Sequence, residues 1–233
     1  NRGGVRTMTV RTCVVTGSRA EYGLLQPLME ELRAARDMTL QVVATGMHLS
    51  PEFGLTHRAI EADGFSLDEK VEMLLSSDTP VGVAKSMGLG VIGFADAFAR
   101  LRPDVLVLLG DRFEILAAAQ AALILKIPIA HIGGGDTTEG AVDEAIRHSV
   151  TKMSHLHFVT NEMAARRVTQ MGEAPSRVFD VGSLGVPTLN LETSSLDDAT
   201  SALPASGVYV TRTEDLDAAR HWNSITNVGF RPT

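Results

Sequence analysis

Acidic and basic side chains that could transfer protons come directly after apolar runs of the chain. Asp111 follows the apolar run 104–109, and Asp143 and Arg147 lie four positions apart on one face of an expected helix. An aspartate that is partly buried where a strand ends has a raised pKa, which suits an acid or base. Asp111 as a helix cap and Asp143 with Arg147 as a surface ion pair are the simpler alternatives. Taken together, the segments favour a catalytic carboxylate held by an arginine.

The loop that joins these two segments is rich in glycine. Residues 133–135 are consecutive glycines, which allow close approach of a ligand or backbone conformations that a side chain forbids, and Asp136 follows them. Glu144 and His148 share the helix face beside Asp143 and Arg147. Several histidines lie near these acids, but no metal-binding spacing such as HExxH or CxxC is present, so we expect no metal.

Two earlier loops carry further polar residues. Ser18, Arg19 and Glu21 stand where the first apolar run opens into a helix. Backbone amides at a helix start together with a guanidinium suit a diphosphate, whereas the simpler interpretation has Ser18 as the cap and Arg19 on the surface. His48 follows the second run, either as a donor to a sugar or phosphate or as a structural hydrogen-bonding group.

Apolar runs and helical patterns alternate along most of the chain. Continuous apolar strands between helices are typical of a parallel sheet covered on both faces, and its ligands bind at the carboxyl ends of the strands. We therefore predict a doubly wound, Rossmann-like α/β domain over residues 1–190. The expected strands are 10–16, 40–45, 104–109, 127–131, 156–159 and 177–181, and the expected helices follow Gly17 and span 81–100, 113–126, 140–153 and 162–172.

The last part of the chain has a different pattern. Residues 191–201 have the composition of a polar connection, followed by a strand-like piece at 207–211 and a short helical piece at 214–222. About forty residues are too few for a second α/β domain with its own core. We expect 191–233 to be a connection and a fragment.

Composition narrows the class of protein. The 28 acidic against 21 basic residues give a net charge of -7, which argues against a nucleic-acid partner. The N-terminal residues lack an apolar signal region, and no stretch approaches the ~20 uninterrupted apolar residues of a membrane span. A single cysteine, Cys13, lies within the first apolar run and is expected to be buried. We expect a cytoplasmic protein with no membrane partner and no cofactor.

Four motifs in order resemble one known family. Residues 17–23, 45–50, 110–114 and 143–152 are similar to segments of the bacterial hydrolysing UDP-N-acetylglucosamine 2-epimerases of sialic-acid and related nonulosonic-acid synthesis. The match runs from about Arg11 to Leu189. The resemblance implies the two-domain glycosyltransferase-B architecture and a homodimer. It also implies elimination of UDP to an unsaturated 2-acetamidoglucal, followed by addition of water to give N-acetylmannosamine.

The resemblance also implies roles for individual residues. Asp111 and Asp143 match the acidic residues of the acid and base steps, and Asp136 is our choice for a third, because Gly133 stands where relatives often have an acid. Arg19 matches the arginine near the diphosphate. The expected substrate-binding residues are Arg19, Glu21, His48, Glu114, Glu144, Arg147 and His148.

Nothing after Asn190 matches the family's second domain, which supplies most nucleotide contacts. We therefore expect a truncated, frameshifted or incompletely represented enzyme with weak or absent activity by itself. One rival is the same reaction on UDP-2,4-diacetamido-2,4,6-trideoxyglucose. A second is a non-hydrolysing epimerase, although those usually open with Gly-Thr-Arg-Pro-Glu where residues 17–21 read Gly-Ser-Arg-Ala-Glu. A third is a non-catalytic module that binds a nucleotide sugar.

Overall fold

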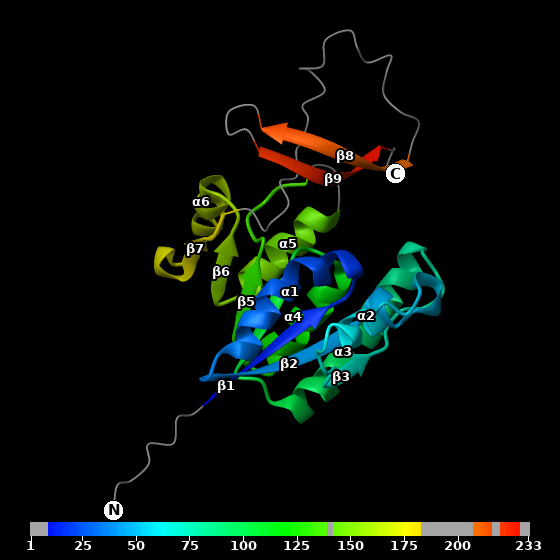
Figure 1. Ribbon diagram of the computed structural model, residues 1–233. Helices are drawn as coiled ribbons and strands as arrows, with labels where there is room; N and C mark the ends of the chain where they lie inside the picture. The colour runs from blue at the N-terminus through cyan, green and yellow to red at the C-terminus, as the bar shows by residue number, and fades with distance from the viewer. Residues whose placement is uncertain (1–8, 139–141, 183–206, 216–219, 229–233) are drawn as a thin grey trace, which may run out of the picture. The chain divides into compact units, whose positions relative to one another are not determined.

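A computed structural model describes residues 9–138, 142–182, 207–215 and 220–228, the last two ranges by their backbone. By internal contacts the chain divides into two units, residues 1–184 and 185–233, which are described separately. The first unit contains the α/β domain with the residues of interest (Figure 1).

A seven-stranded sheet forms the centre of the first unit, and all of its neighbouring strands are parallel. The strand order is β3-β2-β1-β4-β5-β6-β7, so the chain reverses its direction of progress across the sheet between β1 and β4. In such sheets the crevice at the reversal, outside the carboxyl ends, is where ligands bind. The strands are β1 (Val10–Thr16), β2 (Met38–Thr45), β3 (Glu69–Val71), β4 (Val105–Leu109), β5 (Ile129–Ile132), β6 (Leu156–Val159) and β7 (Val178–Asp180).

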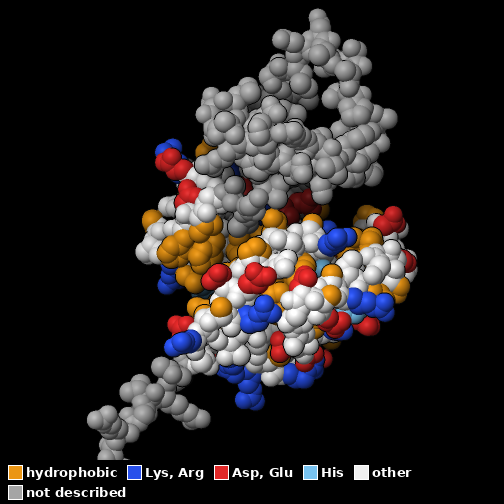
Figure 2. All heavy atoms as spheres, viewed as in Figure 1, with side chains coloured by type: hydrophobic (Ala, Val, Ile, Leu, Met, Phe, Trp, Pro, Cys, Tyr) orange, Lys and Arg blue, Asp and Glu red, His pale blue; other side chains and the backbone are white. Residues whose placement is uncertain are grey.

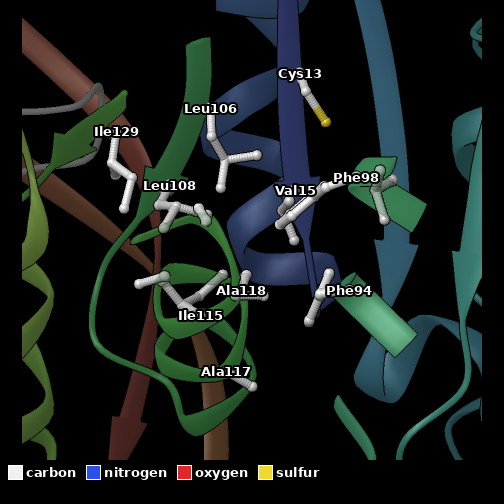
Figure 3. Close-up of a cluster of buried hydrophobic side chains, with 14 of the residues drawn as sticks. Cys13, Val15, Phe94, Phe98, Leu106, Leu108, Ile115, Ala117, Ala118 and Ile129 are labelled. Atoms are coloured by element: carbon white, nitrogen blue, oxygen red, sulfur yellow. The ribbon is translucent and has the colours of Figure 1, made fainter. Parts of the chain in front are cut away.

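Helices cover both faces of this sheet, as the sequence predicts for continuous apolar strands. In β1, Cys13 and Val15 face one core and Val14 faces the other, because successive side chains point to opposite faces. The first core packs against α3, α4 and α5 (Figure 3), and the second packs against α1 and α2. The helices are α1 (Arg19–Ala34), α2 (His57–Ala62), α3 (Pro80–Leu101), α4 (Phe113–Ile124), α5 (Val142–Met153) and α6 (Glu162–Gln170); short 3₁₀ turns are η1 (Gly46–Leu49), η2 (Pro51–Phe53) and η3 (Pro175–Arg177).

The predicted fold class is confirmed, and the predicted burial of Cys13 is confirmed as well. The strand β3 was not expected, because three residues with two charges among them carry no recognisable period. It adds to the edge of the sheet by pairing with β2 through Val43 to Thr45.

The helix α3 is long and apolar enough to cross a membrane by length and composition alone. A core helix meets the same criterion, and α3 contributes Phe94, Ala97 and Phe98 to the first core. Charged residues, among them Lys85 and Asp96, lie on its exposed positions. Its apolar composition is therefore accounted for in part by packing on the sheet.

Apolar side chains also gather over the β6 and β7 end of the sheet (Figure 2). There Phe158 and Phe179 stack with ring centroids 5.4 Å apart, and the Phe179 side chain is exposed. On the other side of these strands, α6 packs Ala164 and Val168 against Val159.

The second unit contains an antiparallel pair of strands, β8 (Gly207–Asp215) and β9 (Arg220–Val228). The strand expected at 207–211 is confirmed and is longer than predicted. The prediction of a helix at 214–222 is wrong, because Glu214 pairs with His221 in the antiparallel β8–β9 ladder. Val, Thr and Ile, which favour strands, recur in 208–213 and 225–228.

Candidate functional site

The functional residues expected from the sequence lie at the starts of α1 and α4, in η1, in the loops after β4 and β5 and on the helix α5. Parallel strands bring their carboxyl ends to one edge of the sheet, so loops distant in sequence meet there. The reversal of strand order lies between β1 and β4. This edge therefore holds two groups of acidic and basic side chains.

The first group is an ion pair between Asp111, after β4, and Arg147, on α5 (the Asp111 pair). The Arg147 side chain is 11% exposed and the Asp111 side chain 21%. Burial raises the pKa of Asp111, Arg147 opposes that rise, and the negative charge of Asp143 adds to it. Arg147 thus holds Asp111 through a contact across 36 positions, and Asp143 acts on Asp111 through its charge.

Asp111 does not cap the following helix, because the N-cap of α4 is Arg112. The alternative role proposed for this aspartate from the sequence is therefore wrong. Its carboxylate binds a guanidinium from another helix instead. This arrangement leaves a partly exposed carboxylate with a raised pKa at the edge where ligands bind.

A buried histidine connects the two sides of the Asp111 pair. His131, in β5, is fully buried, and its Nε2–H donates to the carbonyl of Gly110 at 2.8 Å. Its unprotonated Nδ1 lies 3.2 Å from Thr151 Oγ1, which lies 2.9 Å from the carbonyl of Arg147, so the one hydroxyl proton serves either of these two acceptors. Burial lowers the pKa of His131 to about 4, so the ring is neutral at pH 7. His131 thus links the backbone beside Asp111 to the backbone of Arg147.

The second group joins Arg112 to two glutamates, Glu114 and Glu21 (the Arg112 cluster). Arg112 Nη2 donates to Glu114 Oε1 at 2.8 Å, and its Nε lies 3.6 Å from Glu21 Oε1. The Glu114 side chain is fully buried, whereas 36% of the Arg112 side chain is exposed. Burial raises the pKa of Glu21 to about 7, although the amide of Gly17 and the charge of Arg112 lower it.

The side chains of Ser18 and Glu21 bind the backbone amides at the start of α1. Ser18 is the N-cap, as the simpler interpretation of this loop predicts, and it also forms a capping box with Glu21, which was expected to bind substrate. Glu21 Oε2 accepts from the amides of Gly17 at 2.8 Å and Ser18 at 3.2 Å. These two amides are therefore engaged, and the exposed Arg19 offers the positive charge of this loop to a ligand.

His48 is held inside the protein. Its Nε2 hydrogen-bonds Thr16 Oγ1 at 3.0 Å, and its Nδ1 hydrogen-bonds Thr56 Oγ1 at 2.8 Å. The residue is fully buried, and burial lowers its pKa to about 4. These contacts match the structural role that the sequence left open for His48, and they do not favour direct contact with a substrate.

The remaining expected residues lie along the loop after β5 and on α5. Asp136 accepts hydrogen bonds from Thr160 Oγ1 at 3.0 Å and from Asn161 Nδ2 at 3.4 Å, which direct it towards the end of β6. Its role as a third catalytic acid stays a prediction.

Glu144 accepts from the amide of Thr138 at 3.1 Å, and its Oε1 lies 3.7 Å from His148 Nε2, so these two residues share a face as predicted.

The glycines at 133–135 allow the loop after β5 to pack closely against α6. Gly135 has φ +83°, a conformation that side chains rarely adopt, and a Cβ there would lie 2.4 Å from the carbonyl oxygen of Ala164 in α6. Of the two uses expected for these glycines, the unusual backbone conformation is observed at Gly135. Its close neighbour is a helix of the same domain.

A hollow of about 800 Å³ opens beside the Arg112 cluster, between the loops after β2 and β3 and the start of α4. Arg112 lies on its wall, where Nη2 also approaches Met47 Sδ at 3.4 Å. Arg112, His131 and this hollow were not among the features predicted for the site. Arg112 lies inside the motif 110–114, so the sequence carries a signal for it, whereas the role of His131 depends on contacts between elements.

No three His, Cys, Asp or Glu side chains are grouped to hold a metal ion within the part of the chain that the structure describes. The charged groups at the edge of the sheet instead neutralise one another in arginine–carboxylate contacts. The chemistry that these residues offer is proton transfer and the binding of polar ligands.

The fold defines the class: a Rossmann-like α/β domain whose strand order reverses between β1 and β4, similar in fold to solved UDP-N-acetylglucosamine 2-epimerases over just under half of their length. A structure of UDP-GlcNAc 2-epimerase from Neisseria meningitidis bound to UDP-GlcNAc superposes with a TM-score of 0.67 at 21% identity, over 75% of this chain and 46% of that one. The model of the family described as UDP-N-acetylglucosamine 2-epimerase matches residues 30–216. The chain belongs to this family.

Two similar curated relatives are hydrolysing enzymes. The GDP/UDP-N,N'-diacetylbacillosamine 2-epimerase (hydrolyzing) of Campylobacter jejuni is 48% identical, over 75% of this chain and 45% of its own length. The UDP-N,N'-diacetylbacillosamine 2-epimerase (hydrolyzing) of Legionella pneumophila is 41% identical, over 78% of this chain and 48% of its own length. The chain spans about half the length of the curated relatives it matches.

Proposed function

We propose that this chain carries the acid–base half of a hydrolysing UDP-N-acetylglucosamine 2-epimerase, which converts UDP-N-acetylglucosamine and water to N-acetylmannosamine and UDP. The observation that carries the proposal is the Asp111 pair, with the charge of Asp143 acting on it, at the edge of the sheet where ligands bind. Two acidic residues in different environments suit the two proton transfers that the reaction needs.

The reaction begins with elimination. A carboxylate takes the proton from carbon 2, the bond from carbon 1 to the UDP oxygen breaks, and the electron pair forms the double bond of a 2-acetamidoglucal. Water then adds its oxygen to carbon 1, and a second carboxyl group donates a proton to carbon 2 on the opposite face and takes up the proton that the water loses, while the first carboxyl releases its proton to solvent. We assign these transfers to Asp111 and Asp143. The raised pKa of Asp111 makes it a stronger base than an exposed aspartate and allows it to return a proton.

The other residues bind and orient the substrate. Arg147 holds Asp111, and Arg19 lies at the start of α1, where an exposed guanidinium and the positive end of the helix favour a diphosphate. Glu144 and His148 remain candidates for contact with the sugar, and Asp136 remains the candidate for a third catalytic acid. Glu21 and Glu114 act through Arg112 in this proposal, because both are buried.

A second candidate substrate is UDP-2,4-diacetamido-2,4,6-trideoxyglucose in the same reaction. The relatives at 48% and 41% identity, both named for diacetylbacillosamine, favour it.

We further propose that residues 1–190 form the N-terminal domain of the family architecture and that residues 191–233 do not form a complete second domain. On that basis we expect this chain alone to turn over slowly, whereas a non-catalytic module would bind a nucleotide sugar without releasing UDP.

The test is incubation of the purified chain with UDP-N-acetylglucosamine and, separately, with the diacetamido substrate, following UDP and the sugar product by NMR. Free N-acetylmannosamine and UDP would support the first substrate, and Asp111→Asn and Asp143→Asn should abolish the release. Retained UDP in an epimerised product would show a non-hydrolysing enzyme. Binding without any turnover would support a non-catalytic module, and turnover near that of full-length relatives would contradict the expected weak activity.

A further inference from the structure

The outer side of α3 carries large apolar side chains that the described part of the domain leaves in solvent. Val81, Leu89 and Ile92 are 64%, 44% and 65% exposed, and 33% of the apolar 18-residue stretch of this helix is buried. The neighbouring helix α4 adds Leu123 and Ile124, which are 43% and 80% exposed. Monomeric proteins rarely expose a large contiguous apolar surface, so we expect a partner to cover this side of α3.

One stripe along α3 has a charge at each end and apolar side chains between them. Its members are spaced by four, three and four residues, which places them on one face of the helix, over roughly 16 Å of its length. They are Lys85, Leu89, Ile92 and Asp96, and all four are exposed. Within the described residues, neither Lys85 nor Asp96 forms an ion pair, although the charge of Asp96 acts on Arg100.

This order of residues makes the stripe complementary to a second copy of itself. A two-fold axis perpendicular to α3 places two copies of the helix antiparallel, and every contact between them then occurs twice. With the axis between positions 90 and 91, Lys85 faces Asp96 of the partner subunit. In the same register, Leu89 faces Ile92 of the partner subunit. A parallel arrangement would instead place lysine against lysine, so the charges favour the antiparallel pair.

The glycines of α3 agree with the close approach of another helix. A Cβ at Gly90 would lie 2.8 Å from Met73 Cε, and one at Gly93 would lie 2.7 Å from Val71 Cγ1, so packing inside the domain explains these two glycines. A Cβ at Gly88 would meet no atom within 4 Å. An exposed glycine inside a helix lowers helix stability relative to alanine, and contact with a partner helix compensates for this loss.

We propose that two copies of this chain associate through an antiparallel contact between their α3 helices, centred between positions 90 and 91 (the α3 interface). This inference concerns assembly and does not depend on the proposed reaction. A lipid surface is a poorer partner for the stripe, because helices that bind anionic lipid surfaces carry cations beside their apolar face. Here Asp96 ends the stripe, and the chain has a net charge of -7.

The first experiment measures the mass of the purified 233-residue chain by light scattering and sedimentation across a dilution series. We expect twice the mass of one chain at high concentration. Leu89→Asp and Ile92→Asp should each raise the dimer dissociation constant roughly a hundredfold, because the interface would bury an unpaired charge. Met163→Asp is the matched control, because Met163 is 71% exposed on α6. A native chain that stays monomeric, or dimers unchanged in both α3 variants, would overturn the proposal.

Exchange of the two charges tests the register. Lys85→Asp and Asp96→Lys should each weaken the dimer roughly tenfold, because like charges then face each other. An equimolar mixture of these two variants should recover the native affinity, since each variant supplies the charge that the other lacks. Glu31→Lys, at an exposed position of α1, should change neither variant when it is mixed with them. A mixture as weak as the separate variants would exclude the antiparallel register.

Cross-linking tests the contact between the two apolar residues. A disulfide requires Cα atoms within about 7 Å, which the proposed register brings together between positions 89 and 92 of opposite subunits. Under mild oxidation, a mixture of Leu89→Cys and Ile92→Cys chains should therefore form more disulfide-linked dimers than either variant alone. The native chain, whose single Cys13 is buried, supplies the background. Yields that do not rise in the mixture would contradict the register.

Vesicle flotation distinguishes a second copy from a lipid surface. The chain is mixed with vesicles of phosphatidylcholine and phosphatidylglycerol, and we expect it to remain unbound and dimeric. Vesicle binding that Leu89→Asp abolishes would assign the face to a membrane and refute the α3 interface.

Discussion

The Asp111 pair and the Arg112 cluster are built in opposite ways at the same edge of the sheet. In the Asp111 pair the arginine is the more buried partner, at 11% exposure against 21% for the carboxylate. In the Arg112 cluster the Glu114 carboxylate is fully buried and the arginine is 36% exposed. Each buried charge is compensated by a partner, which burial requires. The edge therefore presents a carboxylate at one point and a guanidinium at the other.

The difference explains why only one group is suited to proton transfer. Asp111 is accessible and its pKa is raised by burial, whereas Glu114 is enclosed and serves to hold Arg112 against the hollow. Four substitutions test this contrast.

The largest effect is expected for Arg147→Met, which leaves Asp111 partly buried without its cation. The free energy of unfolding should fall by about 3–5 kcal/mol, as for other buried pairs that lose one partner. The pKa of Asp111 should rise further, because Arg147 lowers it in the native protein. Urea denaturation and NMR titration of the carboxyl carbon measure the two effects.

The matched control for that substitution is Arg166→Met. Arg166 pairs with Glu162 on the surface of α6, where the side chains are 71% and 77% exposed. Such pairs contribute about 0–1 kcal/mol. Equal losses in the two variants would mean that the Asp111 pair behaves as a surface pair.

Gly46→Ala is expected to disrupt the Arg112 cluster next most strongly. Gly46 has φ +56°, and a Cβ there would lie 2.7 Å from Glu114 Oε1 and 3.1 Å from the carbonyl oxygen of Gly17. Strain and overpacking together should cost about 2–4 kcal/mol in thermal or urea unfolding. Gly23→Ala, in α1 with open space around its Cβ, should instead leave the protein as stable or slightly more stable.

Glu21→Gln tests the pKa of the Arg112 cluster. The native pKa of Glu21, about 7, lies above its ordinary value of 4.5, so the folded state binds the proton more tightly than the unfolded state. The stability from this group is fully present below pH 4.5 and is lost as the pH rises through 7. The loss amounts to at most roughly 3 kcal/mol, at 1.36 kcal/mol for each pKa unit.

In the Glu21→Gln protein this part of the pH dependence should disappear. Unfolding free energies measured by urea at intervals between pH 4.5 and 8 would show the flatter profile. Glu31→Gln, on the exposed side of the same helix, should keep the native slope. An identical slope in native and Glu21→Gln proteins would contradict the raised pKa.

The smallest effect is expected at His131, which links the two sides of the Asp111 pair. His131→Leu leaves the Gly110 carbonyl without its donor and should cost about 1–3 kcal/mol, whereas His131→Gln retains an N–H donor and should cost less. UDP release, if the proposed function holds, should fall more in the leucine variant. Equal stability and equal release in both variants would show that the link does not position Asp111.

Most of the α/β architecture could be predicted because its signal is local. Six strands follow from continuous apolar runs and the long helices from a period of 3.6, and the N-cap at Ser18 confirms a prediction made from adjacent residues. β3 and the full extent of the β8–β9 pair could not be predicted from local patterns. A three-residue edge strand has too few residues for a period, and Glu214 belongs to a strand through its pairing with His221, which no local pattern states.

The sequence by itself determined the fold class, the family and the segments that bring acids and arginines to one edge of the sheet. Only the tertiary structure decided that Arg147 holds Asp111, that His48 and Glu114 are enclosed and that Arg112 faces a hollow. The physical reason is distance along the chain. Helix and strand periods act over a few residues, whereas the partners of a charge 36 positions away depend on the order of the strands and on which helix packs beside them.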